Sequence, residues 1–236
     1  MRTTLGVMLV AVAMPAAAAT IDEVKAAVRR LSAPQPVRAT FATESASKAA
    51  GRFANDQSKR NASVVVTHGS DGISITFPPA LLESARNGGQ DIIGSIRSIA
   101  VVEALDYRDT FLTMLEHATV LKETRSTFGG RAARLLELEL KAPPRKESNV
   151  IRIGSVKKDD RMKLWVGDDD LPMAAERNEK TSAGVMMIRA TGSSRTKYIY
   201  GHAAGRLILA RVETSVSGSG MGQSVETSGV QTLTVH

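Results

Sequence analysis

The spacing of apolar residues predicts a helix near the start of the chain. Apolar side chains recur at intervals of three and four between residues 21 and 31: Ile21, Val24, Ala27, Val28 and Leu31. This period predicts an amphipathic helix over 21–31. Thr20 is placed to cap its first turn, and Pro34 and Pro36 lie just beyond its end.

A period of two follows, which is typical of strands. Residues 64–67 and 73–77 flank the polar stretch 68–72, and its Asp71-Gly72 pair predicts a tight hairpin turn. Residues 46–60 are polar and rich in small side chains, so we expect a long loop or a weak edge strand there.

The middle of the chain is predicted to be helical. Pro78 and Pro79 precede a predicted helix over 80–87, and Gly88-Gly89 ends it. A second helix is expected over 106–117, where Phe111, Leu112 and Leu115 share one side. The stretch 92–105 is read as a helix as well.

Antiparallel strands are expected from there to the end of the chain. Leu136, Leu138 and Leu140 alternate with Glu137 and Glu139, the pattern of a half-buried strand. Glycine-rich segments, among them 192–194 and 217–222, are read as turns between short strands. The predicted fold is α+β and mainly antiparallel β, a half-open β-barrel of meandering strands with an N-terminal helix and mid-chain lid helices.

The first 19 residues are typical of a secretory signal peptide. Arg2 supplies a positive charge, residues 5–14 are mostly apolar, and 15–19 are small residues with an A-x-A arrangement. The apolar run is about half the roughly 20 residues that a membrane-spanning helix needs. We therefore expect cleavage near Ala19, a single domain over 20–236, and a mature chain with no transmembrane segment.

Composition refines this picture. The chain contains no cysteine, which excludes disulfides and thiolate chemistry and suits a bacterial periplasmic protein better than a disulfide-rich extracellular module. Lys and Arg number 31 against 24 acidic residues, a formal charge of +7. In an exported protein this excess points to envelope partners or to a solvated surface rather than to nucleic acid.

No catalytic or metal constellation can be assembled from the sequence. The four histidines have no metal-ligand spacing, and two of them, His68 and His202, are read as turn residues. The run 168–170 lacks the pattern of a calcium loop, and 218–222 does not open a helix as a phosphate loop must. Residues 45–48 match S-x-x-K without its companion motifs. The chain is therefore predicted to be no enzyme and to need no cofactor or metal.

Apolar residues provide the candidate site. Six of them are predicted to line a cavity between a lid helix and the sheet: Phe77, Phe111, Leu112, Leu115, Leu138 and Trp165. The alternative, in which such residues fill an ordinary core, stays open because the sequence does not separate a hollow barrel from a filled one.

The order of elements resembles that of the bacterial periplasmic lipoprotein-carrier superfamily (LolA/LolB-like). The shared features are a signal peptide, an N-terminal helix, strands, mid-chain helices and antiparallel strands to the end. The resemblance implies a half-open barrel with an apolar cavity for acyl chains. The helix over 21–31 would match the N-terminal helix of the family, and the helices over 80–87 and 106–117 would match its lid.

Two functions follow as expectations. The first is a periplasmic, non-catalytic carrier or binder of a lipid, an acylated molecule or another apolar ligand, as in the sorting of outer-membrane lipoproteins. The second is an envelope interaction or sensory domain with a packed core that binds a protein partner. The oligomeric state is left open.

Overall fold

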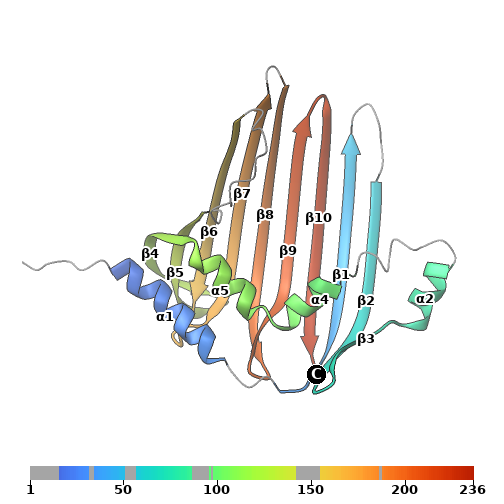
Figure 1. Ribbon diagram of the computed structural model, residues 1–236, viewed down its shortest axis with the longest axis horizontal. Coiled ribbons are helices and arrows are strands. Elements are labelled where there is room, and N and C mark those ends of the chain that lie inside the picture. The colour runs from blue at the N-terminus through green and yellow to red at the C-terminus, as the bar shows by residue number, and fades with distance from the viewer. Residues whose placement is uncertain are drawn as a thin grey trace, which may run out of the picture.

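Ten antiparallel strands form one open sheet, and short helices cover part of one of its faces (Figure 1). The structure is a computed structural model, and it describes residues 16–31, 35–50, 57–86, 96, 98–141, 155–185 and 188–236. Residues 1–15 of the predicted signal peptide lie outside this set. The cleavage of that peptide stays a prediction.

Two meanders, one of the first three strands and one of the remaining seven, join side by side in the sheet. In chain order the strands are β1 (Val37–Ala50), β2 (Gln57–Gly69), β3 (Gly72–Thr76), β4 (Ala118–Phe128), β5 (Arg131–Leu140), β6 (Ser155–Val166), β7 (Pro172–Val185), β8 (Ile188–Ala203), β9 (Arg206–Gly220) and β10 (Gln223–Val235). Their order in the sheet is β3-β2-β1-β10-β9-β8-β7-β6-β5-β4. The first strand therefore pairs with the last, and β3 and β4 are the edges. The predicted fold class, mainly antiparallel and open, is confirmed.

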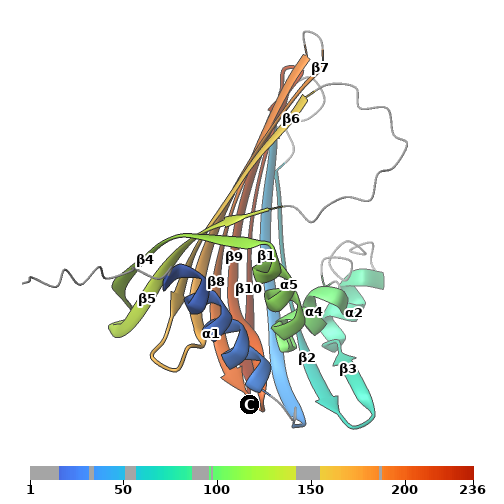
Figure 2. The same cartoon turned by 60° about the vertical axis from the view of Figure 1, so that its left-hand side comes forward.

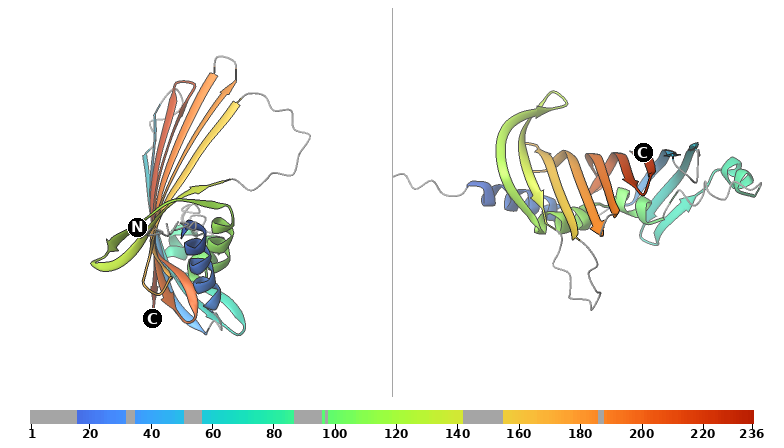
Figure 3. Two further views of the ribbon diagram at one scale, coloured as in Figure 1. Left: turned by 90° about the vertical axis from the view of Figure 1, so that its left-hand side faces the viewer. Right: turned by 90° about the horizontal axis from the view of Figure 1, so that it is seen from above.

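The helices lie on one face, near one end of the strands (Figure 2). They are α1 (Ala16–Arg30), α2 (Pro79–Arg86), α4 (Ser98–Leu105) and α5 (Arg108–Glu116). Among them, α1 packs on α5 and β4, and α4 packs on β9. At the β4 edge, β4 and β5 curl out of the plane of the sheet (Figure 3).

The core fills the space between these helices and the sheet. Its largest fully buried side chains come from both layers: Phe41, Leu105, Phe111, Leu115, Leu136, Leu138, Met162, Leu164 and Leu207. On α1, Val24 and Val28 are fully buried, as the spacing of apolar residues predicts. Burying each such side chain contributes about 1.5–3 kcal/mol, so this layer holds the fold together.

The start of α1 differs from the prediction. The helix begins at Ala16, so Thr20 lies inside it and does not cap it. The Thr20 hydroxyl instead donates a hydrogen bond of 2.8 Å to Oε2 of Glu123 on β4.

The predicted tight turn at Asp71-Gly72 is confirmed, and a second one joins β4 to β5. Gly72 has φ of +105° and closes the hairpin between β2 and β3, where Gly69 pairs with Gly72. Gly129 and Gly130, with φ of +57° and +78°, join β4 to β5. A positive φ suits glycine because it has no side chain to clash with the backbone.

Other predicted loops and turns are wrong in whole or in part, because the strands are longer than expected. The turn predicted over 217–222 is confined to Met221 and Gly222, which both have a positive φ. The described parts of 46–60 belong to β1 and β2, residues 192–194 lie inside β8, and 217–220 end β9. His68 and His202 likewise lie in β2 and β8 rather than in turns. Small and polar residues are depleted in strands. Here 46–50, 192–194 and 217–220 have strands on both sides, and the backbone pairing of the neighbours holds them extended. Residues 57–60 pair with β1 alone, since β3 pairs β2 only from Val65 onward, so they form an edge strand as the second alternative for 46–60 predicts.

Seven strands continue well past the helices, and this defines two parts of the sheet. We call the part under α1, α4 and α5 the covered half. The bare half consists of 44–50, 57–61, 155–159, 178–185, 188–197, 213–220 and 223–230. Among the described residues, no helix lies over either face of the bare half (Figure 3).

Candidate functional site

The six predicted cavity residues do not form one group. Phe111 and Leu115 are 0% exposed and Leu138 is 1% exposed, all within the core between α5 and the sheet. Phe77 and Leu112 are half-buried and pack against that core. The helix face predicted for the lid therefore does point at the sheet, and the residues there are in close contact with one another.

Trp165 lies on the other side of the sheet. It pairs with Leu135, whereas its neighbour Leu164 pairs with Leu136 and is buried under the helices. Successive side chains of a strand point to opposite faces. Trp165 accordingly contacts Phe128, with ring centroids 5.7 Å apart, on the face away from the helices. We call this face the far face.

Three tyrosines mark the boundary between the covered and the bare half. Tyr107, in the turn between α4 and α5, stacks on Tyr198 and Tyr200 of β8, with ring centroids 6.1 and 6.0 Å apart. Phe111 meets Tyr200 edge to face at 5.4 Å. Burial raises the pKa of Tyr107, Tyr198 and Tyr200, so all three stay protonated. The only sequence signal is the i, i+2 spacing of Tyr198 and Tyr200, which places both on one face of β8.

A buried ion pair lies next to the tyrosines. Asp160 of β6 is 5% exposed and accepts two hydrogen bonds from Arg177 of β7, at 2.8 and 2.6 Å. Lys158 lies 3.3 Å from the same carboxylate. Burial alone would raise the pKa of Asp160, but the hydrogen bonds and charge of Arg177, aided by Lys158, hold it below its ordinary value. This pair was missed, because nothing in the sequence sets the register of β6 against β7.

A buried cation anchors the turn between α4 and α5. Arg206 of β9 is 4% exposed and lies 3.5 Å from the Asp106 carboxylate. The backbone N–H of Tyr107 donates to the Leu207 carbonyl at 2.8 Å, so the turn is bound to β9 twice. Burial lowers the pKa of His68, and the charge of Arg206 lowers it further. These contacts hold the helix layer in place.

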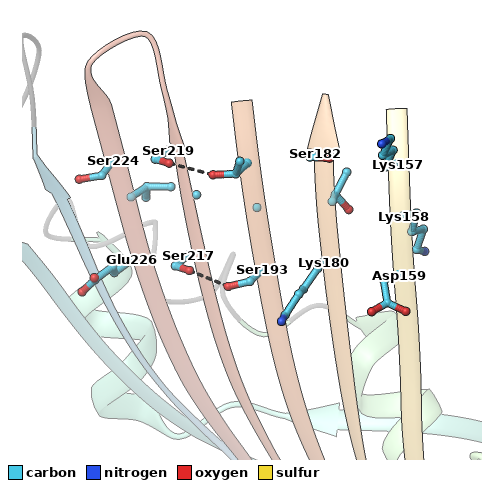
Figure 4. A pocket seen from close by; sticks show the side chains of 15 residues that line it. Lys157, Lys158, Asp159, Lys180, Ser182, Ser193, Ser217, Ser219, Ser224 and Glu226 are labelled. Atoms are coloured by element: carbon cyan, nitrogen blue, oxygen red, sulfur yellow. Dashed lines mark hydrogen bonds between the residues drawn. The ribbon is translucent and has the colours of Figure 1, made fainter. Parts of the chain in front are cut away.

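The far face of the bare half carries hydroxyl groups in ordered rows (Figure 4). Ser193 and Ser217 are hydrogen-bonded at 2.8 Å, and Thr191 and Ser219 at 3.0 Å, each pair between β8 and β9. In the strand register, Lys180 of β7 pairs with Ser193, and Glu226 of β10 pairs with Ser217, so both belong to the same row. These rows run across the strands, perpendicular to the chain direction.

Two shallow hollows lie between such rows. The first, of about 560 Å³, crosses β6 to β10 and includes Lys157 and Lys180. The second, of about 530 Å³, crosses β9, β10, β1 and β2 and includes Lys48 and Lys59. Most of the remaining lining is serine, threonine and glycine, so the surface offers hydrogen-bond donors and acceptors together with positive charge. Sequence reasoning missed it because it interpreted parts of these strands as loops and turns.

The described part of the chain contains no group of three or more His, Asp or Glu that could hold a metal ion. Of the helices that the structure describes, none is both long and apolar enough to cross a membrane.

Comparison with known proteins adds little. No family model matches the chain, and no curated protein matches it. Among solved structures, a chain in the crystal structure of MucB in complex with MucA(peri) aligns over 92% of this chain and 93% of its own length. Its sequence identity is 10% and its TM-score is 0.22. The likeness is loose, and the function is argued below from the geometry of this chain alone.

Proposed function

We propose that this chain is a non-catalytic binding protein of the bacterial cell envelope, and that it holds a protein partner on the bare half of its sheet. The observation that carries the proposal is the bare half itself. Seven strands extend beyond the helix layer without burying an apolar face of their own. Hydrophobic burial is the main favourable term in folding, so a sheet that large is not explained by the stability of the core.

The chemistry of the bare half supports a protein partner. Its hydroxyl rows can both donate to and accept from a peptide backbone, and Lys157 and Lys180 add positive charge. Among the residues that the structure describes, 155–160 of β6 pair with β7 alone, because β5 pairs β6 only between Arg161 and Val166. Edge strands of this kind are a common means of binding another chain.

The envelope location and the absence of catalysis rest on the sequence. Residues 1–19 have the layout of a signal peptide, and no nucleophile–base or metal-ligand spacing occurs in the chain. The two buried charged residues among those that the structure describes are engaged in holding strands and helices together: Asp160 with Arg177, and Arg206 with Asp106.

The carrier of an apolar ligand is the second candidate. It is favoured by the helix layer over an apolar sheet face and by Phe77 and Leu112, which are half-buried on the outside of that core. An acyl chain would have to enter between α5 and the sheet, where Phe111 and Leu115 are now fully buried. This function requires the helix layer to move.

Photo-crosslinking in the producing cell tests the two candidates. A photoreactive residue replaces Ser193 or Ser219 of the bare half, and the matched control replaces the exposed Thr113 on α5. We expect a discrete protein adduct from the two sheet positions only. An adduct of extractable lipid from a probe at Leu112 would favour the carrier. Equal adducts at Ser193 and Thr113, or none at any position, would contradict the proposed function.

A further inference from the structure

The two hollows on the far face join into one groove. They share Ser217 and Glu226, so the lining continues from β6 across β7, β8, β9, β10 and β1 to β2. Neighbouring strands lie about 4.8 Å apart, which makes a groove across seven strands about 29 Å long. An extended polypeptide of about nine residues spans that length.

The charges of this groove are unbalanced. Lys48, Lys59, Lys157 and Lys180 are all exposed, and none forms an ion pair with any described residue. Two carboxylates oppose them: Asp159, which is bound to Arg161 at 2.9 Å, and Glu226 near the centre. Lys157 and Lys180 lie toward one end of the groove, and Lys48 and Lys59 toward the other.

We propose that the groove binds an acidic, extended segment of the partner protein. This inference rests on the proposed function and names the chemistry of its partner. Carboxylates of the segment pair with the lysines toward the two ends, and its backbone hydrogen-bonds to the hydroxyl rows on β8 and β9. Opposite charge across an interface favours encounter and excludes like-charged partners. Glu226 sets a preference for an uncharged residue at the centre of the segment.

The shape of the groove favours a polypeptide over a small molecule. Small-molecule sites are concave and mostly apolar. This groove is shallow, and apart from Ala46, Val216 and Val225 its described lining is polar or glycine. Lysine ammonium groups are point charges on flexible stems and do not impose the planar geometry with which arginine binds phosphate. They suit side-chain carboxylates at variable spacing.

Binding of a labelled peptide tests the inference. The probe is a fluorescent nine-residue peptide with glutamate at every position except a central glycine, and a peptide with glutamine in place of glutamate is the control. Fluorescence anisotropy is recorded with the intact mature chain. We expect saturable binding of the glutamate peptide that weakens as salt is added, and no binding of the glutamine peptide.

A charge-matched pair of variants locates the binding. Lys157→Glu with Lys180→Glu changes two lysines of the groove, whereas Lys122→Glu with Lys141→Glu changes two exposed lysines outside it. The first variant should bind the glutamate peptide at least about tenfold more weakly, and the second should change affinity less than about twofold. Lys48→Glu with Lys59→Glu repeats the test at the other end. All these lysines are exposed, so the variants should unfold at the same temperature as the parent.

Four results would overturn the inference. Equal loss of binding in the groove and control variants would mean that only the net charge matters. Polygalacturonate, an acidic polysaccharide, could bind more tightly than the glutamate peptide and depend equally on Lys157 and Lys180. That result would mean that the groove binds a polysaccharide and not a polypeptide. Failure to bind the glutamate peptide, while Ser193 still crosslinks to a protein, would leave the proposed function standing and reject the acidic segment. Loss of both signals would reject both.

Discussion

The same strands have two different characters along their length. In β1, Phe41 is 1% exposed beneath the helices, whereas Ser45 and Ser47 on the same face are only partly covered and Lys48 is exposed. In β9, residues 206–209 are all buried, whereas 215–217 and 219 are exposed. Backbone pairing continues from one half to the other, with a register shift between Ile199 and Tyr200 of β8. Hydrogen bonding therefore forms the strand in both halves, and only the covered half has a core.

This difference separates stability from function within one sheet. Among the described residues, buried apolar side chains stop where α4 and α5 stop, and the tyrosines and the Asp160–Arg177 pair occupy the boundary. Beyond it, most side chains are small, hydroxylated or charged, and apolar ones such as Val156, Val216 and Val225 are exposed. Mutations in the covered half should change stability, and those on the far face of the bare half should change binding.

The largest expected effect is that of a charge in the core. Leu115→Asp places a carboxylate where the side chain is 0% exposed, next to other fully buried apolar residues. Loss of apolar burial and the cost of an unpaired charge should together exceed about 4 kcal/mol. Circular dichroism of the purified variant should show an unfolded or largely unfolded chain at 25 °C.

Thr113→Asp is the control for this substitution, because Thr113 lies on the exposed side of the same helix. It should unfold at the temperature of the parent protein. If Leu115→Asp stayed folded and merely lost the ability to bind fatty acid, the space beneath α5 would be a ligand cavity. The carrier function would then be preferred.

A smaller loss is expected at the boundary. Arg177→Ala removes both hydrogen bonds to the Asp160 carboxylate, which is 5% exposed, and leaves Lys158 as its remaining cation. Breaking a fully buried pair costs about 3–5 kcal/mol. Since Arg177 is 31% exposed and Lys158 remains, we expect about 2 kcal/mol less stability in urea at neutral pH.

The pH dependence of stability tests the same pair. The folded-state pKa of Asp160 is below its unfolded value of about 3.9. Its contribution to stability is therefore present above the unfolded pKa and is lost as the pH falls through the folded pKa. In Arg177→Ala the lowering contribution of Arg177 is gone while burial remains, so acid unfolding should begin at a higher pH. If parent and variant lost stability over the same acid pH range, the Asp160–Arg177 pair would not stabilise the fold.

The covered half could be predicted well from the sequence, for a physical reason. A buried face requires apolar residues at the regular spacing of a helix or a strand. This spacing predicts α1 from Val24 and Val28, and β5 from Leu136 and Leu138. It also placed Phe111 and Leu115 on the inward side of α5. The bare half has no buried face and hence no period. Its serine and glycine residues were therefore mistaken for turns at 192–194 and 217–220.

The candidate site was harder to predict than the fold. Alternation along β6 shows that Leu164 and Trp165 point in opposite directions, but it does not say which face the helices cover. The Asp160–Arg177 pair and the lysines of the groove depend on strand register, which brings together residues far apart in the chain. Lys48 and Glu226 face each other in this way across β1 and β10.

One substitution at the boundary, Tyr200→Phe, is expected to raise stability rather than lower it. The Tyr200 hydroxyl is buried and has no hydrogen-bond partner among the described residues. Tyr200→Phe keeps the ring contacts with Tyr107 and Phe111 and removes a buried polar group that is not satisfied. A gain of about 1 kcal/mol is expected, seen as a higher urea midpoint. Tyr198→Phe is the contrast, because its hydroxyl interacts with Arg177 and Thr196, and it should lower the midpoint.

The smallest effect is expected on the far face of the bare half. Ser217→Ala removes the 2.8 Å hydrogen bond to Ser193 between two exposed side chains. Water can hydrogen-bond to the Ser193 hydroxyl in place of Ser217. Surface substitutions of this kind usually change stability by less than about 0.5 kcal/mol. Urea unfolding should therefore not distinguish the variant from the parent. A fall of about 2 kcal/mol in the free energy of unfolding would instead mean that the hydroxyl rows hold the strands together. The division between a stabilising half and a binding half would then fail at the centre of the groove.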